Sequence, residues 1–145
     1  MEKSKKFIKL CAKYGVDPEN VPEVLDFESA CKITGNDPGK LPIVKEIPPK
    51  HRNRIVADYK LSIIAEALGG GNPDYTDTNQ YKYFPYFEVK ADKKRKSGFG
   101  LSYCGYVSWY SISVVGVRLC FPNWDQAKFF GNHFIGLHKD HQLLT

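Results

Sequence analysis

A repeat of 20 residues at the N-terminus constrains the fold of this chain more than any other feature of its sequence. Residues 7–24 read FIKLCAKYGVDPENVPEV, and residues 27–44 read FESACKITGNDPGKLPIV. The two segments share the pattern F-x-x-x-C-x-x-x-G-x-D-P-x-x-[VL]-P-x-V. This pattern predicts two similar units, in each of which a short helix ends at a glycine.

The spacing within each unit has a physical interpretation. The phenylalanine and the cysteine are four residues apart and therefore lie on one face of a helix. Gly15 and Gly35 follow at the position where a left-handed C-terminal cap favours glycine. The Asp-Pro pair then opens a tight turn or a short helical turn. Units this small cannot bury their apolar face alone, so we expect them to pack on each other or on the rest of the chain. A partner-binding arm is the alternative.

Pro48 and Pro49 separate the repeat from the remaining chain, so we predict tandem helix–turn units over residues 1–46 and one domain over residues 47–145. Apolar spacing predicts a helix from about Lys50 to Leu68, which ends at three glycines. The aromatic segments 81–91, 98–113 and 114–121 are typical of strands, with an edge or a bulge at Pro85.

A last helix is predicted after Pro122, because Asn123 and Gln126 have the spacing of a capping box. The fold class is therefore α+β: N-terminal helical repeat units, then a helix, an antiparallel aromatic-rich sheet, and a C-terminal helix packed on the sheet.

The segment KKRKSGFGLSYCGYVSWY at residues 93–110 carries the clearest functional signal, because it places four cations beside many aromatic rings. Such rings stack on bases, while cations neutralise phosphates. The net charge of +5 also favours an anionic partner. We therefore predict seven ligand-binding residues: Lys93, Lys94, Arg95, Lys96, Tyr103, Trp109 and Arg118. The alternative is that the rings are core residues and the cations form a solvated hairpin loop.

The predicted geometry depends on strand alternation. Barring a bulge, Tyr103, Gly105 and Trp109 share one side of their strand. The two rings would then flank a gap at Gly105 that admits a flat ligand. Arg118 is the single charge in the segment VVGVRLCF. Its side chain either points to solvent or faces the ligand.

Signatures of catalysis are missing from the sequence. It contains no nucleophile-elbow, P-loop or dinucleotide-binding motif, so we predict neither catalytic residues nor a cofactor. His133, His138 and His141 fall on one predicted helix, whereas metal sites draw ligands from several elements, so no metal site is predicted. No apolar run reaches the length of a membrane span or a signal peptide. The four cysteines are accordingly expected to be reduced, in a cytoplasmic protein.

Four segments together resemble a known family: ADYKLSIIAEAL at 57–68, QYKYFPYFEVKADKK at 80–94, SGFGLSY at 97–103 and VGVRLCF at 115–121. The family consists of small uncharacterised proteins from gut Bacteroides genomes and from the phages and prophages that infect those bacteria. The resemblance covers residues 27–144. It implies an accessory protein that works in the cytoplasm of a bacterial host, and it assigns no activity to any residue.

The sequence thus favours a non-catalytic protein that binds a nucleotide-like anionic ligand and sequesters a signalling nucleotide of host defence. A module that binds single-stranded nucleic acid is the first alternative. A protein-interaction role, as an inhibitor or a structural protein, is the second. The sequence leaves open whether the protein forms a homo-oligomer.

Overall fold

The computed structural model describes residues 2–72, 74, 76–95, 98–109 and 117–143. Five α-helices and one antiparallel pair of strands lie in these ranges, which confirms the α+β class. The elements, with two short 3-10 helices η1 and η2, are α1 (Lys5–Tyr14), η1 (Pro18–Asn20), α2 (Phe27–Thr34), α3 (Pro49–Ala67), β1 (Lys82–Ala91), β2 (Phe99–Trp109), η2 (Val117–Leu119), α4 (Trp124–His133) and α5 (Ile135–Gln142).

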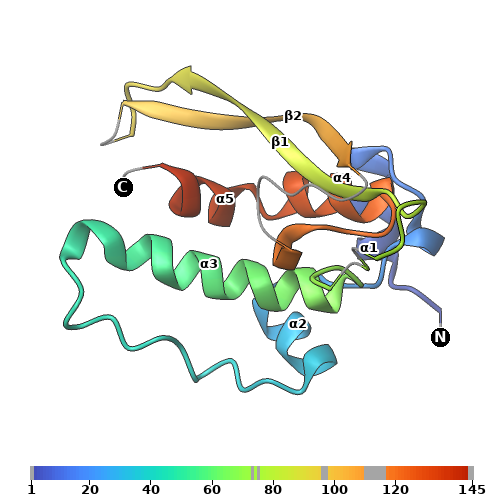
Figure 1. Cartoon of the computed structure of the whole chain (residues 1–145), viewed down its shortest axis with the longest axis horizontal. Coiled ribbons are helices and arrows are strands. Elements are labelled where there is room, and N and C mark those ends of the chain that lie inside the picture. Colours follow the sequence, from blue (N-terminus) through green and yellow to red (C-terminus); the bar gives the residue numbers. More distant parts are fainter. Residues whose placement is uncertain (1, 73, 75, 96–97, 110–116, 144–145) are drawn as a thin grey trace.

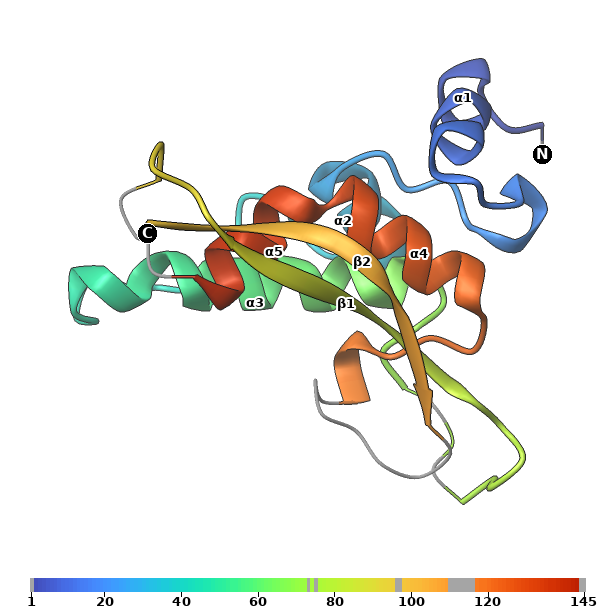
Figure 2. The same ribbon diagram turned by 90° about the horizontal axis from the view of Figure 1, so that it is seen from above.

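The elements are stacked in layers, as Figure 1 shows. The ribbon of β1 and β2 covers α4 and α5, and α3 runs along the other side of these two helices. The short helix α2 packs against α3 on the face away from the sheet. Seen from above, α1 lies beside α4 at one end of the molecule (Figure 2).

Both repeat units form the predicted helix and end as the pattern requires. Gly15 follows α1 at φ 64°, and Gly35 follows α2 at φ 72°. In this left-handed region glycine avoids the steric cost that other residues incur. The Asp17 side chain accepts a hydrogen bond from the backbone of Glu19 and so begins η1. The first Asp-Pro pair therefore opens a short helical turn.

The two units pack on different helices. The ring of Phe7 lies 5.4 Å from that of Phe129 in α4, whereas the ring of Phe27 lies 6.3 Å from that of Tyr59 in α3. The segments that follow the Asp-Pro turns of the two units differ more in burial. Val21 is fully buried, but Leu41, its counterpart in the second unit, is 42% exposed. The apolar residue that the repeat pattern places after the Asp-Pro turn is thus buried only in the first unit.

The helix α3 has the predicted extent, and its C-terminus turns through Gly69 and Gly71, which both have positive φ. The Asn123 side chain accepts a hydrogen bond from the Gln126 backbone, as the capping pattern predicts. The single helix expected after it is interrupted, because Phe134 leaves helical geometry at φ −102° and ψ 25°. Helix α5 begins at the next residue.

The strand predicted over residues 114–121 is wrong where the structure describes it, because residues 117–119 form η2. The backbone groups that follow have partners from elsewhere in the chain. The Cys120 carbonyl accepts the N–H of Gly71 at 2.9 Å, and Phe121 exchanges two hydrogen bonds with Tyr83. These contacts leave a single bridge in place of a ladder. Residues 110–116 lie outside the described ranges.

Candidate functional site

Of the seven residues predicted to bind a ligand, those whose side chains the structure describes are distributed over separate parts of the molecule. The hairpin loop after β1 holds Lys93 and Lys94, both exposed, while Lys96 lies outside the described residues. The guanidinium of Arg95 is directed to α5, where it lies 3.9 Å from a carboxylate oxygen of Asp140. Arg95 therefore belongs to the packing between this loop and α5.

A bulge in the ribbon contradicts the predicted shared face. Tyr86 pairs with Gly105, but the next residue, Phe87, pairs with Tyr103, so Cys104 is the extra residue. Neighbouring residues of β1 point to opposite faces. Tyr103 and Gly105 therefore also lie on opposite faces of the ribbon, and the predicted gap between Tyr103 and Trp109 is wrong. The Trp109 side chain lies outside the described part of the chain.

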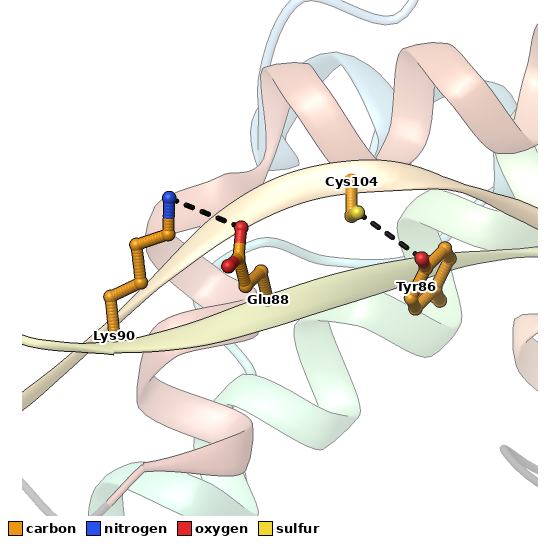
Figure 3. A network of polar contacts seen from close by, with 4 residues as sticks. All are labelled: Tyr86, Glu88, Lys90 and Cys104. Carbon is orange, nitrogen blue, oxygen red and sulfur yellow. Dashed lines mark hydrogen bonds and ion pairs between the residues drawn. The ribbon is translucent and has the colours of Figure 1, made fainter.

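The two faces of the ribbon have different surroundings. The Tyr103 ring faces the helices, 6.3 Å from the ring of Phe87, and burial raises the pKa of its hydroxyl to about 12. On the outer face, the Cys104 thiol donates a hydrogen bond to the Tyr86 hydroxyl at 3.2 Å (Figure 3). Tyr103 is thus a packing residue between sheet and helix.

Arg118 is exposed on η2 and lines a cavity of about 420 Å³. The other lining residues come from the C-terminal end of α3 and the turn that follows it: Ser62, Glu66, Gly70, Gly71 and Asn72. The hairpin loop lies at the far end of the ribbon from η2 in both views (Figures 1 and 2). Arg118 is therefore not brought together with Lys93 and Lys94.

A second cavity of about 420 Å³ gathers more polar groups, and we take it as the candidate site. It lies among α3, β1, α4 and α5, beside η2. Its polar lining is Arg54 and Asp58 from α3, and His138, His141 and Gln142 from α5. Its apolar lining is Pro85, Phe87, Leu119 and Phe130. This volume is within the range of about 300–1,000 Å³ found for small-molecule sites.

Helix periodicity explains how these polar groups meet. Arg54 and Asp58 are four residues apart on α3, and His138 and His141 are three apart on α5, so each pair lies on one helix face. Because α3 packs against α5, the two pairs face the same space. Nε2 of His141 lies 3.1 Å from the Asp58 carboxylate and holds the two helices together on the polar side.

His138 is the most deeply buried of these groups, with 2% of its surface exposed. Its ring centroid is 4.7 Å from those of both Phe87 and Phe130. Burial among these rings lowers the pKa of His138 to about 3, although a hydrogen bond with the Phe130 backbone opposes that effect. Nε2 of His138 and Nδ1 of His141 are both buried, and neither has a hydrogen-bond partner among the described residues.

A neighbouring cavity extends the site toward the start of α3. It shares Arg54, His141 and Gln142 with the candidate site. It is also lined by Lys50, His51, Asp140 and Leu143. Asp58 contacts His141 and Asp140 contacts Arg95, so both carboxylates have a partner. Within the described ranges, neither Lys50 nor Arg54 has a carboxylate at ion-pair distance. With the histidines neutral, the three cations Lys50, Arg54 and Arg95 outnumber the two carboxylates around these cavities by one.

The sequence held a signal for this site in the two histidines, which fall on the inner face of an amphipathic helix. Asp58 and Arg54 could not be joined to them without knowing that α3 packs on α5. No group of three or more metal-binding side chains occurs in the described part of the chain. No helix there is both long and apolar enough to cross a membrane.

Comparisons with known proteins add no assignment: no family model, no curated protein and no solved structure matches the chain.

Proposed function

We propose that the protein binds a small anionic ligand of the nucleotide kind in the cavity lined by Arg54, His138 and His141, without chemical turnover. One observation supports this most directly: two cations without carboxylate partners adjoin a cavity whose inner wall is aromatic. Arginine suits a phosphate group because its planar fork donates two parallel hydrogen bonds.

The two halves of the cavity suit the two halves of such a ligand. The phosphate would lie at the mouth, near Arg54 and Lys50, where it remains partly hydrated. The flat base would enter between the apolar residues Pro85, Phe87 and Leu119. In the phage setting that the sequence resemblance implies, a bound nucleotide would be a signalling molecule of the host, and binding would sequester it.

Isothermal titration with nucleoside monophosphates and cyclic nucleotides tests this function. We expect Arg54→Gln to weaken binding by about 10- to 100-fold, since a hydrogen bond to a charged group contributes about 1.5–3 kcal/mol. Arg118→Gln is the matched control, because Arg118 lines the other cavity. Loss of binding in the Arg118 variant alone would place the ligand there. If no anion binds to the folded wild-type protein, the proposal is wrong.

A module for single-stranded nucleic acid is the second candidate, and a separate row of rings favours it. Tyr81, Tyr83, Tyr106 and Trp124 follow one another with centroid distances of 6.0, 5.7 and 5.9 Å. Three of these rings are about two-fifths exposed, and Lys128 lies over Trp124. A steep loss of oligonucleotide affinity with salt, and weaker binding by Trp124→Ala, would support this function over the first.

A further inference from the structure

The hydrogen positions on the two cavity histidines can be assigned from their partners. The Phe130 backbone makes a hydrogen bond that favours the protonated ring of His138, so the backbone carbonyl accepts and the ring donates. Since Nε2 has no partner among the described residues, the donor is Nδ1. A neutral imidazole carries one hydrogen. Nε2 of His138 is therefore a hydrogen-bond acceptor.

The same reasoning applies to His141. Its Nε2 lies 3.1 Å from the Asp58 carboxylate, which in its ionised form can only accept, so this nitrogen carries the hydrogen. In the neutral ring, Nδ1 is then an acceptor as well. Two acceptors on one face of α5 thus lack a donor within the described ranges. The donors lining the cavity, Arg54 and Gln142, bond to neither nitrogen.

A buried acceptor without a donor destabilises the folded protein relative to one that is paired. Solvent does not relieve this cost, because both nitrogens are covered by neighbouring side chains. A ligand that brings a donor would relieve it and gain affinity by the same amount. Admitting that donor requires a small shift of the lining side chains around the two rings.

We propose that the ligand of this cavity is a nucleotide whose base carries an exocyclic amino group, and that His138 recognises that group through Nε2. This inference rests on the proposed function, because it concerns the same cavity and the same phosphate anchor at Arg54. An amino group supplies the hydrogen that Nε2 of His138 lacks. The faces of the base would contact the apolar wall formed by Pro85, Phe87 and Leu119.

The test compares pairs of ligands that differ only in the amino group: adenosine monophosphate against purine riboside monophosphate, and guanosine monophosphate against inosine monophosphate. We expect the amino-bearing member of at least one pair to bind wild-type protein about tenfold more tightly, which corresponds to about 1.4 kcal/mol. A site built around a hydrogen bond rejects an analogue that lacks the matching group.

Two variants separate this recognition from the phosphate contact. His138→Phe keeps a flat ring between Phe87 and Phe130 but removes the acceptor, so the preference should fall to about twofold or less. Arg54→Gln should weaken both members of a pair equally and leave their ratio unchanged. Thermal denaturation confirms that each variant is folded before titration.

The outcomes are distinguishable. Absence of binding by every nucleotide would overturn the proposed function and this inference together. Binding with equal affinity for both members of each pair, or a preference that persists in His138→Phe, would overturn the inference alone. Nitrogen-15 spectra of the histidine rings give a check without ligand: a hydrogen on Nε2 of His138 instead of Nδ1 would contradict the assignment.

Discussion

Acid should destabilise this protein well above the pH at which its carboxylates are protonated, and His138 is the reason. The pKa of His138 falls from 6.5 to about 3 on folding because the ring is buried. Between these two values the unfolded chain binds a proton that the folded chain does not. Stability is therefore complete above pH 6.5 and is lost progressively as the pH falls through 6.5 toward 3.

The magnitude follows from linkage. Each pH unit within this window costs up to about 1.4 kcal/mol, so the free energy of unfolding should fall by about 2 kcal/mol between pH 7 and pH 5. Glu23, Asp26 and Asp74 also have lowered pKa values in the folded state. Their contributions are lost mainly below pH 5, because stability held by such carboxylates disappears only near and below the unfolded pKa.

Urea denaturation at pH 7, 6 and 5 measures the effect. The variant His138→Phe should lose most of the pH dependence in this range, whereas His51→Gln should keep it, since His51 is exposed. The comparison uses the slope of the free energy of unfolding against pH. Absolute stabilities are not compared, because the substitution also removes the hydrogen bond to Phe130. Equal slopes for wild type and His138→Phe would refute the reasoning, as would a His138 resonance that titrates above pH 5.

Three further predictions concern the fold. Val21→Ala should lower the free energy of unfolding by about 2 kcal/mol and Leu41→Ala by about 1 kcal/mol or less, because only the first residue is fully buried; equal losses in urea denaturation would contradict the asymmetry of the two repeat units. Gly131→Ala should cost about 3 kcal/mol or more, since an added Cβ would lie 2.6 Å from Pro85, and an unchanged melting temperature would refute this contact. Folded protein should expose one rapidly reacting thiol, Cys104, and unfolded protein four; fewer than four without reductant would indicate a disulfide.

Local signals in the sequence were sufficient for helices α1, α2 and α3 and for the start of α4, but not for the break at Phe134. The glycines that end α1 and α2 and the cap at Asn123 act within one turn of their own helix, so a short pattern determines them. The spacing of the apolar residues within α3 is likewise sufficient to predict that helix. These elements could be predicted because the residues that start and stop them lie next to them in the chain.

The errors arose where distant partners decide the local structure. The segment around η2 has β-branched residues typical of a strand, yet its backbone groups bond to Gly71 and Tyr83. The bulge at Cys104 changes which residues share a face, and no alternation pattern reveals one extra residue. The predicted gap beside Gly105 relied on unbroken alternation, so the bulge removes it, and the described members of the predicted site lie on separate surfaces.

The histidines of α5 illustrate a signal that was visible but undervalued. Phe130, Phe134 and His138 follow one another at intervals of four residues, so the imidazole occupies a position where this stripe otherwise places phenylalanine. A phenylalanine there would pack between the same rings without an unpaired nitrogen and without the loss of stability in acid. A buried titratable group with a strongly shifted pKa beside a cavity is a candidate for a functional position. For this reason the cavity beside His138, and not the more conspicuous basic loop, is the first place to search for a ligand.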